Sequence, residues 1–257
     1  MNEHGSTRVS NIGVLKLLAA RDKLKGSGDY IRAAATVNRC LSAFRSAWNW
    51  GRTAGLIQQE RGWPTRLLLT EPRGRTRYLS DDELKNLLDE AAKHSVVMRA
   101  AIVVAIATGL RQGELLRLER KDIAFQRQRI IILETKSDQP RAVHLPVVAI
   151  EALRELQSSK VVGQRCIYFG SNPVDRKSAL AARWERIRSA ANLSDFRWHD
   201  LRHSCASFLA QKSASLVEIG GVLGHKIPSV TFRYAHRVQG NPVTGHAALD
   251  AKLRGRT

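Results

Sequence analysis

Cysteines are few in this sequence, and the three present are far apart, at Cys40, Cys166 and Cys205. None has a partner at the short spacing of a zinc site, so reduced thiols are expected. No apolar run is long enough to cross a bilayer, and no apolar signal core follows Met1. These absences argue against a disulfide scaffold, a zinc module and a membrane protein, and they favour a cytoplasmic protein.

Acidic residues are also scarce. The 257 residues include 23 Asp and Glu against 42 Lys and Arg, a formal net charge of +19 at pH 7. Such an excess favours a polyanionic partner, because each phosphate that a side chain neutralises releases condensed counterions. Nucleic acid is therefore the expected partner, although basic chains also bind membranes or ribosomes without specificity.

The chain is long enough for two domains. Pro, Gly and alternating Arg over 62–64 and 71–77 are typical of an exposed basic linker, which places the boundary between residues 72 and 73. The expected domains are 1–72 and 73–257. No internal repeat or low-complexity segment is found.

One clear helix is predicted in the first domain, over 31–55. Its apolar residues share one face because they follow one another at steps of four, three and four, namely Val37, Leu41, Phe44 and Trp48. Arg32 and Arg39 lie on the other side, where solvation and DNA contact are equally good explanations. The residues before Gly26 are only weakly patterned.

The second domain is predicted to be mainly α with a small antiparallel β-sheet. Ser80 before three acids is an N-cap signal, and another helix is expected over 96–107. Residues 129–134 and 142–145 are β-branched or apolar runs around a polar turn, which predicts a β-hairpin. From 147 to 236 the pattern indicates helices with short breaks.

Arg111 follows a Thr-Gly break and opens a short predicted helix, near backbone N–H groups that also favour an anion. Glu114, one turn on, is placed to orient the Arg111 guanidinium. An ordinary surface ion pair explains this spacing equally well when it is taken alone.

The segment HDLRH places His199 and Arg202 on one helical face. Later, Ser215 and Glu218 form a capping-box pattern for a helix that Gly224 ends, which leaves His225 just beyond it. Pro228 is then expected to begin another short helix carrying Tyr234. Singly, such residues are more often satisfied polar pairs or packing residues.

Taken in order, these residues resemble the tyrosine recombinase, or phage integrase, family from about Arg77 to His236. The motifs that carry the resemblance are Arg111, Lys136, HDLRH with His199 and Arg202, Leu-Gly-His225, and RYAH with Tyr234. The resemblance implies a helical core-binding-like DNA-binding domain over 1–72 and a catalytic domain with a C-terminal tail over 73–257. It also implies a C-shaped clamp on double-stranded DNA.

The implied activity is site-specific recombination or integration of DNA, as in mobile elements, through a 3′-phosphotyrosyl intermediate. The protein would be bacterial or phage-encoded and nucleoid-associated, a monomer in solution and a homo-tetramer on synapsed DNA. Arg32, Arg39 and Arg77 are candidate DNA contacts. The tail after His236 either docks onto a neighbouring protomer or is a free terminus. The part before Arg77 is short for the family, as in a truncated or a minimal member.

The chemistry explains the residue types. Negative charge develops on the non-bridging oxygens when a phosphodiester is attacked, and the permanently charged guanidiniums of Arg111 and Arg202 would meet it. Tyr234 is the expected nucleophile, with His199 as its base. The resemblance gives Lys136 the protonation of the leaving 5′ oxygen, and His225 would bind a non-bridging oxygen. No cofactor or metal is expected, because the phosphotyrosine keeps the bond energy.

Two alternatives stay open at this point. Type IB topoisomerases use an equivalent set of residues to relax supercoils, although the His-x-x-Arg and Leu-Gly-His motifs favour a recombinase. A catalytically inactive DNA-binding relative is the other alternative, and it is disfavoured because every matched position is filled.

Overall fold

The computed structural model divides the chain into two compact units, Met1–Arg75 and Thr76–Thr257, here called the N-terminal and C-terminal units. The division falls close to the expected boundary after residue 72. The structure describes residues 12–26, 31–57, 63–64, 66–72, 75–133, 140–158, 166–167, 173–225 and 228–237.

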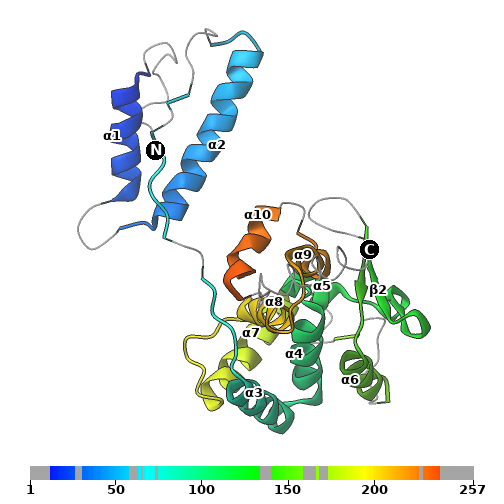
Figure 1. Ribbon diagram of the computed structural model, residues 1–257. Helices are drawn as coiled ribbons and strands as arrows, with labels where there is room; N and C mark the ends of the chain where they lie inside the picture. The colour runs from blue at the N-terminus through cyan, green and yellow to red at the C-terminus, as the bar shows by residue number, and fades with distance from the viewer. Residues whose placement is uncertain are drawn as a thin grey trace, which may run out of the picture. The chain divides into compact units, whose positions relative to one another are not determined.

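The N-terminal unit pairs two helices, α1 (Val14–Lys25) and α2 (Ala34–Thr53), shown in blue in Figure 1. Val37, Leu41 and Trp48 of α2 are buried, as the predicted stripe required, whereas Phe44 is 40% exposed. Helix α1 was not predicted, because its apolar residues follow no single helical face and its Leu, Ala and Lys residues favour a helix by propensity alone.

The chain between the two stretches expected as a linker packs onto α2. Asn38 on α2 donates to the Leu69 carbonyl at 2.9 Å and accepts from the Leu69 amide at 2.8 Å. Leu67, two residues before Leu69, is fully buried. The buried Asn38 side chain thus has partners for both ends of its amide.

The C-terminal unit is mainly helical. Its helices are α3 (Asp81–His94), α4 (Val96–Thr108), α5 (Gln112–Arg117), α6 (Val147–Ser158), α7 (Pro173–Ala190), α8 (Asp200–Gln211), α9 (Leu216–Leu223) and α10 (Pro228–Thr231). Short 3-10 turns are η2 (Arg120–Asp122), η3 (Phe125–Arg127) and η4 (Phe232–Arg237). The mainly α fold with a small sheet is therefore confirmed.

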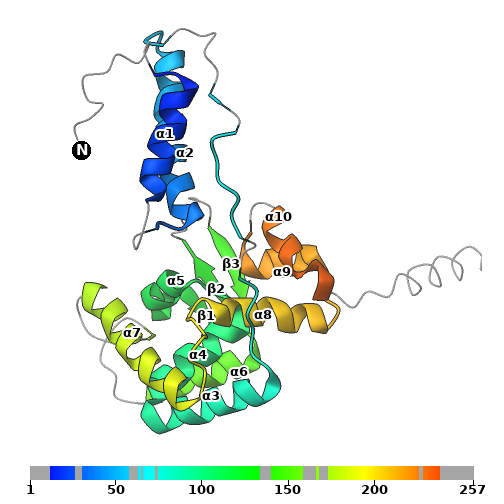
Figure 2. The ribbon, with the colours of Figure 1, turned by 90° about the vertical axis from the view of Figure 1, so that its left-hand side faces the viewer.

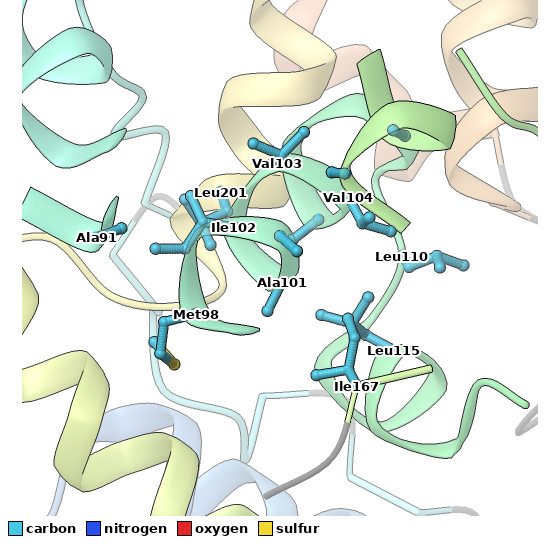
Figure 3. Packing of buried hydrophobic residues seen from close by; sticks show 14 of the residues in the cluster. Ala91, Met98, Ala101, Ile102, Val103, Val104, Leu110, Leu115, Ile167 and Leu201 are labelled. Atoms are coloured by element: carbon cyan, nitrogen blue, oxygen red, sulfur yellow. The ribbon is translucent and has the colours of Figure 1, made fainter. Parts of the chain in front are cut away.

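Helix α4 forms the centre of the C-terminal unit and packs against α3, α6 and α8 (Figures 1 and 2). It is apolar on nearly all sides, as a helix surrounded by other helices must be. Figure 3 shows Met98, Ile102 and Val104 of α4 within the main core, near Leu115 of α5 and Leu201 of α8. The ends of α4 and α8 are fixed by this core.

The sheet contains β1 (Ile123–Ala124), β2 (Arg129–Ile132) and β3 (Arg141–His144), in that order and antiparallel. The predicted hairpin is confirmed by the pairing of Ile130 with Val143 and of Ile132 with Arg141. Ile130, Ile132 and Val143 are buried and Ile131 is exposed, which is the alternation expected of a sheet with one covered face.

Four predicted helix ends are confirmed. Ser80 and Glu83 form a reciprocal capping box at the start of α3, and Ser215 and Glu218 form another at α9. Gly109 and Gly224 end α4 and α9 in the left-handed conformation, with φ of 62° and 64°. Instead of one helix, Pro228 begins the single turn of α10, and Tyr234 lies in the 3-10 turn η4 that follows.

Along the described stretches, no helix combines the length and apolarity needed to cross a bilayer. The apolar helix α4 has 13 residues, too few to span the hydrocarbon core. Its apolar surface is accounted for by the packing around it.

Replacing Ser80 with Ala removes the side chain that accepts from the Glu83 amide. We expect the free energy of unfolding to fall by about 1 kcal/mol, the usual cost of losing an N-cap. Urea denaturation followed by circular dichroism measures it. Ser189→Ala, on an exposed position of α7, is the control and should lose nothing; an equal loss in both variants would contradict the capping role.

Candidate active site

Glu114 is the carboxylate around which the site is built, and it is only 5% exposed. It accepts from the Arg111 amide at 2.8 Å and from the Arg111 guanidinium at 2.9 Å. The Arg141 guanidinium donates to it from β3 at 2.8 Å. The predicted Arg111–Glu114 pair is thus present, and it belongs to a half-buried network that includes a strand.

Arg202 is the most deeply buried of the site's arginines. Its guanidinium donates to the Gly109 carbonyl and to the Leu223 carbonyl, both at 2.6 Å. Arg141 also donates to the Leu223 carbonyl, at 2.6 Å. The loop before Arg111 and the end of α9, just before His225, are therefore joined through Arg202, and α9 packs against α8.

These contacts leave positive charge in the cluster. Burial, followed by the charges of Arg111 and Arg141, lowers the pKa of Arg202 to about 10. Burial raises the pKa of Glu114, but the Arg111 amide and the two guanidiniums outweigh it, so that this pKa lies below its usual value. At neutral pH Glu114 is ionised and the arginines remain charged, which is an arrangement suited to an anion.

Close packing beside these contacts requires glycine at two positions. A Cβ on Gly224 would lie 1.6 Å from the Arg141 guanidinium nitrogen, and one on Gly109 would lie 2.7 Å from the Leu223 side chain. Both residues also have positive φ. Glycine at these positions leaves room for the neighbouring side chains and also allows the left-handed conformation that ends α4 and α9.

His225 lies just after α9, as predicted, and its Nδ1 is 2.9 Å from the Thr231 hydroxyl. Burial first, then the charges of Arg202 and Arg111, lower its pKa to about 4. The imidazole is therefore neutral at neutral pH and can donate one hydrogen bond. Within the residues that the structure describes, no group of three or more His, Cys, Asp or Glu side chains is arranged to hold a metal.

Tyr234 is 1% exposed, and its ring packs against α8 and α9 through Ala206, Ala210, Ile219 and Leu223. Its hydroxyl lies 2.5 Å from Nδ1 of His203. His199, to which the sequence assigned the role of base, stands edge-on to the His203 ring with 5.1 Å between centroids. The imidazole bonded to the Tyr234 hydroxyl is thus that of His203.

Four other predicted residues remain to be described. Lys136 falls outside the described residues. Arg77 donates to Glu83 through both terminal guanidinium nitrogens and stacks on Phe196, so its charge is used to hold the start of α3. In the N-terminal unit, Arg32 donates to the Leu24 carbonyl at 2.7 Å, and Arg39 is exposed on α2.

Two residues of the cluster were missed by sequence reasoning. Arg141 begins β3 and was hidden among the basic residues of a hairpin, although its register opposite Ile132 places it at the turn end. His203 stands next to Arg202 in HDLRH, and the structure shows that it is buried on α8. In the sequence alone, no signal distinguishes it from His199 as the partner of Tyr234.

Residues 77–240 match the sequence model of the phage integrase family. The chain belongs to this family. Among its relatives, the tyrosine recombinase XerC of Rhodospirillum centenum is 30% identical over 240 residues, which cover 88% of this chain and 69% of that one. The integrase of Salmonella phage P22 is 29% identical over 187 residues, covering 67% of this chain and 46% of that one. This phage integrase family member thus spans about half the length of the phage protein.

Solved structures show the same fold. The XerH site-specific recombinase in a pre-cleavage complex with its difH substrate superposes with a TM-score of 0.65 at 24% identity, covering 90% of this chain and 69% of that one. A lambda integrase dimer bound to a COC′ core site gives 0.68 at 21% identity, with coverage of 91% and 83%. The architecture of this family member is therefore that of the DNA-bound recombinases.

Replacing Glu114 with Gln removes the charge that the arginines share. We expect a loss of about 3 kcal/mol in the free energy of unfolding at neutral pH, because the guanidiniums lose their buried counter-charge. The folded pKa of Glu114 is depressed, so its contribution is present above the ordinary value of 4.5 and is lost as pH falls through the folded pKa. The difference between variant and wild type should therefore shrink in acid.

Urea unfolding from pH 7 to pH 3 measures this difference. Glu151→Gln, at an exposed position of α6, is the matched control and should change stability by less than about 0.5 kcal/mol. A loss of the same size at every pH would show that the Glu114 charge is not the source.

Proposed function

We propose that this member of the phage integrase family is a site-specific DNA recombinase, in which Tyr234 attacks a phosphodiester and forms a 3′-phosphotyrosyl bond. The observation that carries the proposal is the convergence of separate segments on Arg202. Its guanidinium bridges the Gly109 and Leu223 carbonyls. Arg111 comes two residues after Gly109, and His225 comes two residues after Leu223. Tyr234 packs in the same apolar cluster as Leu223, the residue whose carbonyl Arg202 binds.

Arg111 and Arg202 are proposed to hold the non-bridging oxygens. Arg202 has five N–H donors and gives two to backbone carbonyls, which leaves donors for phosphate. Arg111 has a half-exposed side chain anchored at one nitrogen by Glu114. Neutral His225 would add one hydrogen bond. Prepositioned donors of this kind stabilise the charge that develops in the transition state.

Tyr234 is the proposed nucleophile and Lys136 the proposed donor to the leaving 5′ oxygen. A phenol has an ordinary pKa of about 10, so it attacks only when its proton is accepted or a positive field is present. The phosphotyrosine keeps the energy of the broken bond, and the strand is rejoined when a 5′ hydroxyl attacks it. Neither ATP nor a metal is required by these steps.

The proposed partner is double-stranded DNA. The net charge of +19 favours it, and the XerH and lambda integrase structures contain their DNA sites. Arg39 on the exposed side of α2 would contact the phosphate backbone, with Arg32 nearby in sequence. We further propose a monomer in solution that assembles as a homo-tetramer on synapsed DNA, in the cytoplasm at the nucleoid.

The direct test is a covalent adduct with nicked site DNA, taken from the flanks of the gene. Wild type should give a slow band on a denaturing gel, and Tyr234→Phe, which lacks the attacking oxygen, should give none. Exchange of strands between two defined sites supports a recombinase, whereas relaxation of any plasmid would favour a topoisomerase. Absence of an adduct with wild-type protein on all site DNA would overturn the proposal.

Arg202→Ala should separate binding from cleavage. One lost phosphate contact changes the slope of log affinity against log salt by about one, whereas the cleavage rate should fall about 10²-fold to 10³-fold. Filter binding and single-turnover cleavage measure the two, with a thermal melt to confirm folding. Arg197→Ala, an exposed arginine just before α8, is the control; equal losses of binding and cleavage in Arg202→Ala would contradict this role.

A further inference from the structure

We propose that His203 is the proton acceptor for Tyr234: its Nδ1 holds the hydroxyl and takes the proton as the tyrosyl oxygen bonds to phosphorus. This inference rests on the proposed function, and it adds a residue to the site. His203 is the group that the structure brings to the reacting oxygen, at 2.5 Å. Both side chains are buried, which shields the hydrogen bond from competing water.

Helix α8 carries both groups that the reaction must bring together. Arg202, the proposed phosphate holder, and His203, the holder of the phenol, are neighbours on this one rigid element. The α8 backbone around them is anchored by Leu201 in the main core and by Ser204, whose hydroxyl accepts from the Leu79 amide at 3.0 Å. Both proposed contacts, the one to phosphate and the one to the phenol, are therefore made from a single helix.

The charges around His203 keep its imidazole neutral. The groups that face it are His199, Asp200 and Arg202 from α8 and Arg233 from η4. Burial is the main cause that lowers its pKa to about 4, and the charges of His199 and the two arginines add to this effect. The Asp200 carboxylate opposes it. A neutral imidazole with its proton on Nε2 has a free lone pair on Nδ1, which accepts from the neutral phenol.

A bound phosphate would change this balance. Its negative charge offsets the positive charges of Arg202 and Arg233, both of which lower the pKa of His203. The imidazole thus becomes a better base when DNA is in place and stays a poor one without it. Tyr234 is covered in the structure described, so binding must also open a path from the arginines to its hydroxyl.

The Tyr234 oxygen forms a bond to phosphorus while its proton passes to His203 Nδ1, and the bond from phosphorus to the 5′ oxygen breaks. The departing 5′ oxygen takes a proton from the proposed donor, Lys136. In rejoining, the 5′ hydroxyl attacks phosphorus and returns its proton to Lys136, the bond from phosphorus to the tyrosyl oxygen breaks, and His203 returns its proton to that oxygen. His199, edge-on to the His203 ring, is then a positioning residue.

The test is single-turnover cleavage of nicked site DNA at saturating protein, with wild type, His203→Ala and His203→Asn. Asn keeps a hydrogen-bond acceptor but cannot take a proton, so we expect both variants to cleave about 10²-fold more slowly or worse. DNA affinity should be unchanged. Added imidazole should restore part of the rate in His203→Ala and none in Tyr234→Phe.

The pH profile gives a readout that a merely structural role would not move. Cleavage by wild type should fall in acid as His203 becomes protonated, and this acid limb should be absent in His203→Asn. His94→Asn, at an exposed position near the end of α3, is the control and should match wild type.

Each outcome has a distinct meaning. Wild-type rates in His203→Asn would overturn proton acceptance, because a hydrogen bond alone would then suffice. Faster cleavage in His203→Ala would overturn it too, since His203 would only hold Tyr234 in a resting position. No adduct with wild type would defeat the proposed function itself. If His203→Ala fails to fold in a thermal melt, the Asn variant and the pH profile decide.

Discussion

The site depends on like charges being held close together by shared acceptors. Arg111 and Arg141 share the Glu114 carboxylate, and Arg141 and Arg202 share the Leu223 carbonyl. Guanidiniums at this spacing repel one another, and burial of Arg202 adds to the cost. Each shared oxygen offsets part of that cost. Because only one acceptor carries a full negative charge, the cluster keeps an excess of positive charge for a ligand.

The use of backbone carbonyls has a further effect. A carbonyl fixes a guanidinium by its dipole without neutralising it, and the planar fork of arginine lets one side chain bind two such groups. Lysine, a point charge on a flexible stem, could not bridge the Gly109 and Leu223 carbonyls in this way. The same bridging explains why the loop before Arg111 and the end of α9 lie where they do.

Much of the fold was predictable because its signals are local. The capping boxes at Ser80 and Ser215, the glycine ends of α4 and α9 and the hairpin all follow from short segments. Helix α1 escaped because propensity without a periodic face is a weak signal.

The site was predictable in part. The order of motifs identified Arg111, Arg202, His225 and Tyr234, which the structure gathers in one region. The roles of Arg141 and His203 could not be predicted from spacing, because they depend on contacts across 82 and 31 residues of chain. Which of two histidines one turn apart faces a phenol is decided by the packing of η4 on α8, and no local pattern encodes it.

The wide separation of the arginine contacts along the chain bears on how the protein folds. The bond from Arg202 to Gly109 closes a loop of 93 residues, and the bond from Ser204 to Leu79 closes one of 125. Such long loops are closed late, after helices and hairpins have formed from nearby residues. The contact between His203 and Tyr234, which closes only 31 residues, is therefore expected to form before the arginine cluster, which is assembled only in the completed tertiary structure.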